Sequence, residues 1–211
     1  MIGNLLFDMG GVLIRWEPRA FVMSIGTDPS DAELLLRAVY MHPDWSELDR
    51  GALTEGEVIR RAKERLPEHL HAMVEPLVSG WDELFTEQMP GMEELLDELA
   101  QAGFRLYLLS NAAKRHHQYW PKFPVSRYFG DRVFVSADYG LLKPDKTFFD
   151  TALSHFGLRA EECLFIDDRE DNVRGAADAG ISGIVFHGNA ERLREELANR
   201  KLVLYKMPGK E

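Results

Sequence analysis

Short apolar runs alternate with segments of helical periodicity along most of the chain. The runs cover residues 5–7, 106–109, 133–135, 164–166 and 183–186. They are continuous rather than alternating, which is typical of strands buried on both faces of a sheet. Strand–helix–strand alternation predicts an α/β fold, a three-layer sandwich in which a parallel, Rossmann-like sheet lies between two layers of helices.

Two helices of this core are marked by apolar spacing and by a glycine after the last apolar position. Apolar residues at 92, 95, 96 and 99 fall on one helical face, and Gly103 follows them. Apolar residues at 173, 176 and 177 repeat the spacing, and Gly180 follows. Glycine suits the left-handed residue that ends many helices. The tail, residues 201–211, has the apolar content for one last short strand.

The segment from residue 16 to residue 88 has helical periodicity and no convincing strand. Capping boxes are expected at Ser30 with Glu33 and at Thr54 with Glu57, and prolines at 43, 67 and 76 are expected to divide the segment into short helices. We therefore predict a small all-helical cap domain over 16–88, inserted into an α/β core formed by 1–15 and 89–211.

Charge and composition indicate which binding partners and which cellular compartment to expect. The net charge of −10 makes duplex nucleic acid and anionic membranes poor partners. No apolar run approaches the length of a membrane span, and the first residues lack the basic flank and cleavage site of a signal peptide. The single cysteine, Cys163, cannot form an internal disulfide and is expected in a buried strand. These features favour a cytoplasmic protein, either a monomer or a homodimer.

Polar residues follow the predicted strands, where parallel sheets bind ligands. Each of these residues taken alone has an ordinary explanation, since an aspartate after a strand often caps a helix or a turn. Their joint occurrence at strand ends favours a site. We expect Pro144 to lie near a helix start and to hold Lys143 in an extended pose. The set is Asp8, Ser110, Asn111, Lys143, Asp167 and Asp168.

Three neighbouring carboxylates repel one another and raise each other's pKa, and a divalent cation removes that conflict. The candidate ligand atoms are all oxygens, which favours Mg²⁺ over metals that prefer nitrogen or sulfur ligands. A site with Mg²⁺, a lysine, a hydroxyl and backbone amides is suited to a phosphoryl group. Gly10 and Gly11 would let the backbone approach that group and present their N–H groups to it.

The quoted motifs resemble those of the haloacid dehalogenase superfamily of hydrolases over most of the chain. The first motif is matched by FDMGGVL, the second by LLSNA, the third by the lysine of LLKPD and the fourth by FIDDREDN. The helical insert resembles the cap domain that some members carry between the first and second motifs. The resemblance implies that the cap closes over the site and selects a small phosphorylated metabolite.

The resemblance also implies roles for individual residues. Asp8 would be the nucleophile that forms an aspartyl-phosphate, and Ser110 and Lys143 would hold the phosphoryl oxygens, with Asn111 in the same corner. Mg²⁺ would be bound by Asp8, by Asp168 and by the backbone carbonyl of Gly10, with support from Asp167. We expect Trp16 and Trp45 to line the substrate site, and Asp44, Asp49 or Arg50 to contact substrate hydroxyls, although packing or solvent exposure explains these residues equally well.

One position departs from the family pattern. Most phosphatases of the superfamily carry a second aspartate two residues after the nucleophile as general acid and base, and here that position is Gly10. A subgroup with DxGxV at this position includes α-glucose-1-phosphate phosphatases, which the chain resembles also at RGALTEGEV. Without that acid, esters with good leaving groups, such as a hexose 1-phosphate, should react best. The alternatives are a metal-independent 2-haloacid dehalogenase and a catalytically weak phosphate-binding or regulatory module.

Overall fold

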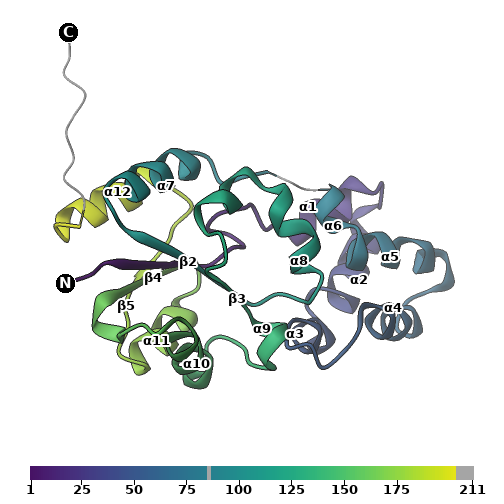
Figure 1. Ribbon diagram of the computed structural model, residues 1–211. Helices are drawn as coiled ribbons and strands as arrows, with labels where there is room; N and C mark the ends of the chain where they lie inside the picture. Colours follow the sequence, from purple (N-terminus) through teal and green to yellow (C-terminus); the bar gives the residue numbers. More distant parts are fainter. Residues whose placement is uncertain (85–86, 203–211) are drawn as a thin grey trace, which may run out of the picture.

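The computed structural model describes residues 1–84 and 87–202, and its centre is a five-stranded parallel sheet (Figure 1). The strand order is β3-β2-β1-β4-β5. The predicted α/β sandwich is therefore confirmed, and each predicted run lies in or against a strand. The strands are β1 (Asn4–Phe7), β2 (Arg105–Ser110), β3 (Val133–Val135), β4 (Cys163–Asp167) and β5 (Ser182–Val185).

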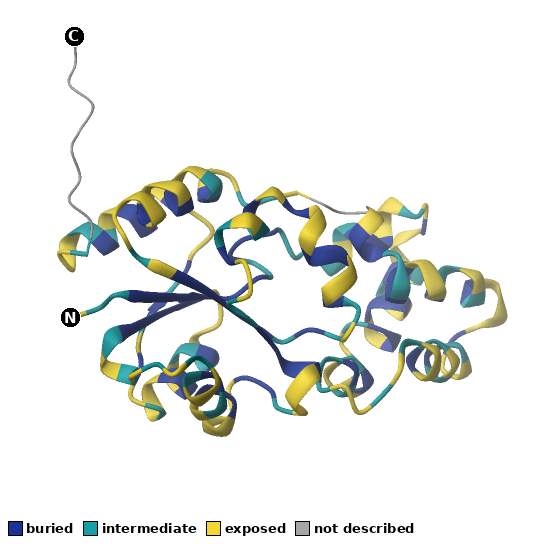
Figure 2. Cartoon of the chain, in the orientation of Figure 1, coloured by how far each residue is buried: buried dark blue, intermediate teal, exposed yellow. Residues whose placement is uncertain are grey.

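The strands are buried because both faces of the sheet are covered (Figure 2). Along β1, Leu5 and Phe7 belong to one apolar cluster and Leu6 to the other. Cys163 is fully buried in β4, as its position predicted. Helices α7 (Met92–Gln101) and α12 (Ala190–Asn199) cover the first face. Helices α10 (Lys146–Phe156) and α11 (Glu170–Asp178) cover the second.

Shorter elements connect this core. The segment after β2 contains α8 (His116–Tyr119) and two 3-10 turns, η2 (Trp120–Lys122) and η3 (Pro124–Tyr128). A single-turn helix, α9 (Ser136–Tyr139), follows β3, and η4 (Ala160–Glu162) precedes β4. Gly103 and Gly180 adopt φ values of 90° and 82°, in agreement with the predicted helix ends.

The segment between β1 and α7 is helical and lies together beyond one end of the sheet (Figure 1). Its elements are α1 (Pro18–Ser24), α2 (Pro29–Ala38), α3 (Pro43–Asp49), α4 (Glu55–Glu64), η1 (Glu68–Leu70), α5 (His71–Ser79) and α6 (Trp81–Leu84). We refer to these elements together as the cap. Its limits, residues 16 and 88, stay a prediction.

The cap confirms one predicted capping box and corrects another. Thr54 and Glu57 form the expected reciprocal box at the start of α4. Ser30, however, lies inside α2, because Asp28 accepts hydrogen bonds from the Ser30 and Asp31 N–H groups and caps the helix instead. Pro76 was expected to break the chain, but it lies within α5.

The two chain segments that join cap and core run side by side. Ile14 and Gln88 form an antiparallel bridge. The Arg15 N–H donates to Glu87 O at 2.9 Å, and the Met89 N–H donates to Leu13 O at 2.9 Å. The chain therefore leaves the core and returns to it at the same place.

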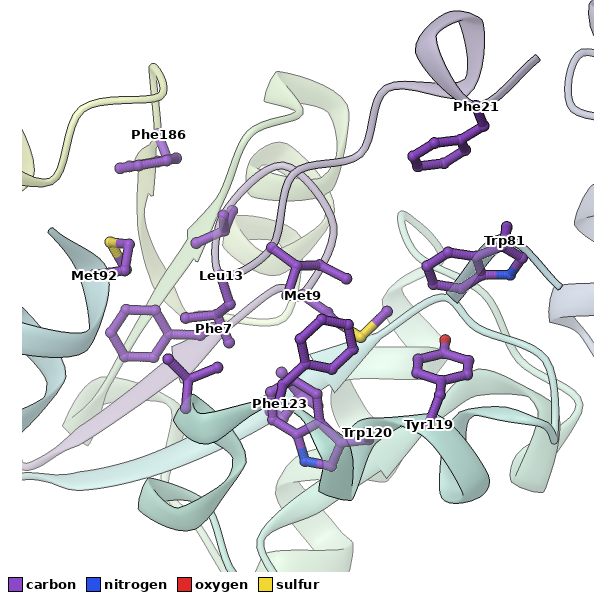
Figure 3. Close-up of a cluster of buried hydrophobic side chains, with 14 of the residues drawn as sticks. Phe7, Met9, Leu13, Phe21, Trp81, Met92, Tyr119, Trp120, Phe123 and Phe186 are labelled. Atoms are coloured by element: carbon purple, nitrogen blue, oxygen red, sulfur yellow. The ribbon is translucent and has the colours of Figure 1, made fainter. Parts of the chain in front are cut away.

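Apolar packing continues from the sheet into the cap (Figure 3). Trp81 of the cap meets Tyr119 of the core with ring centroids 4.8 Å apart, and Phe21 stacks on Trp81 at 6.1 Å. Within the described residues, no helix is long and apolar enough to cross a membrane. The predicted last strand falls largely on residues 203–211, which lie outside the described part of the chain.

Candidate active site

Three aspartates meet at the carboxyl ends of two neighbouring strands, β1 and β4. Asp8 directly follows β1, Asp167 is the last residue of β4, and Asp168 follows it. One carboxylate oxygen from each lies within 4.8 Å of the others. The parallel register of β1 with β4 causes this convergence, because Phe7 pairs with Ile166 and the two strands end together. The sheet thus gathers the carboxylates that the sequence placed at strand ends.

Lys143 is buried among these acids. Its Nζ donates to Asp8 Oδ1 at 2.7 Å, to Asp167 Oδ2 at 2.8 Å and to Leu109 O at 2.9 Å. Asn111 holds the lysine backbone, because its Nδ2 donates to Lys143 O and its Oδ1 accepts from Lys143 N–H, each at 2.9 Å. The amide of Asn111 therefore positions the lysine.

The loop that carries the lysine differs in one respect from the prediction. The peptide bond between Lys143 and Pro144 is cis. Helix α10 begins at Lys146, so Pro144 precedes the helix rather than lying in its first turn. Lys143 is nevertheless outside helical structure, as we expected.

The site carries more negative charge than its lysine balances. Burial raises the pKa of Asp8 to about 7; Lys143 lowers it and Asp167 raises it further. Burial raises the pKa of Asp168, and the neighbouring Asp167 adds to this effect. Burial also opposes the charge of Lys143, but Asp167 and Asp8 outweigh it, so the pKa of the lysine is raised. A carboxylate cluster of this kind is the chemistry that a divalent cation stabilises.

The two adjacent aspartates have different surroundings. Asp167 is fully buried and accepts hydrogen bonds from Asn172 Nδ2 at 3.0 Å and from Arg169 N–H at 2.9 Å. Asp168 is exposed and lines the cavity described below. The carboxylate of Asp167 thus accepts hydrogen bonds from groups of the protein, whereas Asp168 faces the cavity that a ligand would occupy.

The paired glycines serve the site differently from the prediction. The Gly11 N–H donates to Ile14 O at 2.8 Å, so it is not a free donor for an anion. Gly11 has a φ of 77°, and an added Cβ would collide with the Asp168 carboxylate. Gly11 therefore makes room for Asp168, and Gly10 lines the cavity itself.

A cavity of about 600 Å³ opens above the acids, between the core and the cap. Trp16 and Trp45 both line it, with ring centroids 5.9 Å apart. Ser110 and Asp167 are buried at their strand ends and are not among the lining residues. The predicted site residues that line the cavity are Asp8, Gly10, Trp16, Trp45, Asp49, Asn111, Lys143 and Asp168.

The three polar cap candidates are placed in three different settings. Asp44 is buried inside the cap and paired with Arg61 and Arg65, because α4 packs against α3. Arg50 donates to Gly140 O at 3.4 Å, on the core. Only Asp49 among the three lines the cavity.

Several cavity residues carried no clear signal in the sequence. Tyr40, Trp81 and Tyr119 add aromatic rings, and Arg115 adds a guanidinium that donates to the buried Asp82 at 2.6 Å. The two histidines that follow Arg115 do not line the cavity. His116 is fully buried, and burial lowers its pKa to about 3, while His117 pairs with Asp138 at 2.8 Å.

Comparisons with known proteins agree with this geometry. A flavin mononucleotide hydrolase of Arabidopsis thaliana is 31% identical over 156 residues, covering 74% of this chain and 61% of that protein. A D-ribitol-5-phosphate phosphatase of Bacteroides thetaiotaomicron is 25% identical over 207 residues, covering 93% of this chain and 97% of that protein. The chain spans only 36% and 61% of the length of the first two curated relatives that it matches.

The fold is shared with solved structures. A haloacid dehalogenase family enzyme of Bacteroides thetaiotaomicron, in complex with magnesium and inorganic phosphate, superposes with a TM-score of 0.70 at 24% identity, covering 92% of this chain and 99% of that one. The family model described as haloacid dehalogenase-like hydrolase matches residues 2–180. The chain therefore belongs to the haloacid dehalogenase-like hydrolases.

Proposed function

We propose that the protein is a Mg²⁺-dependent phosphatase that cleaves a small phosphate monoester through an aspartyl-phosphate on Asp8. The observation that carries the proposal is the cluster of Asp8, Asp167 and Asp168 around one buried lysine at the floor of a cavity. Mg²⁺ would be held by Asp8, Asp168 and the Gly10 carbonyl, with Asp167 in support. When bound, it supplies positive charge that offsets the acids and the phosphoryl oxygens.

The chain's own residues perform the remaining tasks. Asp8 Oδ attacks the phosphorus atom, which splits one displacement into two easier ones. Lys143 lies 2.7 Å from the Asp8 carboxylate, close enough to orient it and to contact a bound phosphoryl oxygen. Ser110 is the candidate second contact to that group. A substrate bound in the cavity would displace water from it, which would strengthen these interactions.

The cavity suggests what the leaving group looks like. Five aromatic side chains line it, with polar groups at its floor and at Arg115. Aromatic walls bind flat rings and the apolar faces of sugars. Relatives named as hydrolases of flavin mononucleotide and of D-ribitol 5-phosphate support a phosphorylated metabolite of this general kind. A hexose 1-phosphate remains one candidate within this class.

A panel of phosphorylated metabolites, assayed for phosphate release by the chelator-treated protein with and without Mg²⁺, tests the proposal. We expect release that requires Mg²⁺ and that is abolished by Asp8→Asn. Asp171→Asn is the matched control, because Asp171 lies in the first turn of α11, pairs with Arg169 and does not itself line the cavity; it should keep its activity.

Two other outcomes contradict the proposal. Halide release from 2-haloacids that is insensitive to the chelator indicates a dehalogenase. A buried Asp167 beside Asp168 disfavours that activity, because both carboxylates repel a carboxylate substrate. Binding of phosphate without turnover of any ester, at high enzyme concentration, indicates a binding module.

A further inference from the structure

The chemistry at Asp8 needs a group that protonates the departing oxygen, and position 10 offers none. General acid–base catalysis is typically worth about 10²–10⁴-fold, so its source matters. The titratable groups that line the cavity outside the acid cluster are few. The Tyr40 hydroxyl donates a hydrogen bond to Leu77 O at 2.7 Å, and the Glu55 carboxylate accepts one from Ser79 Oγ at 2.8 Å. Both groups therefore already have hydrogen-bond partners in the protein.

Asp49 is the remaining carboxyl group on the cap side of the cavity. It is the last residue of α3 and is partly buried. The Ala113 N–H, in the loop after β2, lies on the core side and acts on the Asp49 carboxylate by lowering its pKa. Asp8 and Asp49 thus line one cavity from opposite domains, and the bound ester would lie between them.

The backbone of Asp49 is fixed to the core by a buried hydroxyl. Ser136 Oγ donates to Asp49 O at 2.5 Å and accepts the Ala112 N–H at 2.8 Å. Ser136 is fully buried. One hydroxyl therefore connects the end of α3 to the loop that follows β2.

Two residues after Asp49, Gly51 of the cap lies close to Ala137 of the core. Gly51 has a φ of 77°, and a Cβ built on it would lie 2.6 Å from Ala137 O. Only a glycine allows α3 to dock this closely on α9. The position of Asp49 is thus set by the contact between the two domains, and not by the cap alone.

We propose that Asp49, supplied by the cap, acts as the proton donor and acceptor that the glycine at position 10 lacks. This inference rests on the proposed phosphatase activity. In the first step, Asp8 Oδ bonds to phosphorus, the ester P–O bond breaks, and the leaving oxygen takes the proton of the Asp49 carboxyl group. In the second step, Asp49 takes a proton from water as the water oxygen attacks phosphorus, and the bond to Asp8 breaks.

The protonation state that the first step needs is consistent with the surroundings. Burial raises the pKa of Asp49 well above its ordinary value; the Ala113 N–H opposes this, and the charge of Asp8 adds to it. Asp49 is therefore protonated at a higher pH than an exposed aspartate. A general acid works best with a pKa near the working pH.

Leaving-group dependence tests the proposal. Asp49→Asn keeps the shape of the side chain but cannot donate an acidic proton. For an alkyl phosphate, kcat/KM should fall by about 10²–10³-fold. For 4-nitrophenyl phosphate, whose leaving group needs no proton, it should fall less than about tenfold. Glu55→Gln, which removes a carboxylate from the same cavity, should change both esters alike.

A second variant separates catalysis from folding. A Cβ at position 10 would meet only Trp16, at 3.4 Å or more, so the backbone there accepts a side chain and Gly10→Asp can be tested. The double variant Gly10→Asp with Asp49→Asn should recover alkyl phosphate turnover. Equal losses for both esters in Asp49→Asn, or no recovery in the double variant, would overturn the role of Asp49 and leave the phosphatase proposal intact. Absence of any phosphatase activity in the unaltered protein would overturn both.

Discussion

Replacing Asp8 with asparagine is expected to stabilise the metal-free protein while abolishing its activity. The pKa of Asp8 is raised from 3.8 to about 7, mainly by burial. Each pKa unit corresponds to about 1.4 kcal/mol, so ionised Asp8 lowers the free energy of unfolding by about 4 kcal/mol. Asparagine resembles the protonated acid and avoids this cost.

The pH dependence gives the prediction its sign. Because the folded-state pKa is higher, the folded protein binds the proton of Asp8 more tightly than the unfolded chain does. Between pH 3.8 and about 7, the stability of the unaltered protein therefore falls as pH rises. The free energy of unfolding of Asp8→Asn should match that of the unaltered protein below pH 3.8. It should exceed it by the full amount above about pH 7.

Urea unfolding of chelator-treated proteins, at acidic and at mildly alkaline pH, measures this difference. Asp171→Asn is the control, because hydrogen bonding to Arg169 lowers the pKa of Asp171, so that variant should not gain stability. Excess Mg²⁺ should reduce the difference in free energy of unfolding between Asp8→Asn and the unaltered protein, since the cation stabilises ionised Asp8. A gain that is equal at both pH values, or no gain at alkaline pH, refutes the reasoning.

Three further substitutions test other parts of the structure. Gly11→Ala should weaken Mg²⁺ binding by about 10–100-fold in a metal titration, because its Cβ displaces the Asp168 carboxylate; Gly10→Ala, which meets only ordinary contacts, should bind the metal normally. Thr54→Ala should lower the free energy of unfolding by about 1 kcal/mol without changing kcat/KM, since only a capping box is lost. Asn111→Ala should reduce kcat/KM by about 10–100-fold, because the backbone of Lys143 loses both of its hydrogen bonds to the Asn111 side chain; unchanged kcat/KM would show that Lys143 needs no such support.

The sheet could be predicted from the sequence because its signal is local. A strand buried on both faces must be a continuous apolar run, and the carboxyl ends of parallel strands must meet at one edge. By these two rules the sequence alone predicts that Asp8 and Asp167 lie close together. The start of α2 was mispredicted because Pro29 suits a first helical position, so Asp28 and not Ser30 precedes the helix.

The cavity could not be predicted in the same way. Tyr40 lies in the turn after α2 and Tyr119 is the last residue of α8, and only the docking of cap on core brings both to one cavity. Asp49 likewise has a local pattern that fits a solvent-exposed helix end. Its environment comes from Ala113 and Ser136, more than sixty residues away in the chain. Contacts between residues far apart in the chain produce no local pattern of apolar and polar positions, so the sequence does not predict them.

The paired crossover at Ile14 and Gln88 has a consequence for how such a protein diversifies. Since the cap starts and finishes at neighbouring points, the order and register of the strands require no particular length of chain between those points. A lid of different length or shape can be grafted at that junction while the acidic floor keeps its geometry. A change of lid would alter the walls of the cavity and the surroundings of Asp49, while Asp8, Asp167 and Asp168 stay on the sheet.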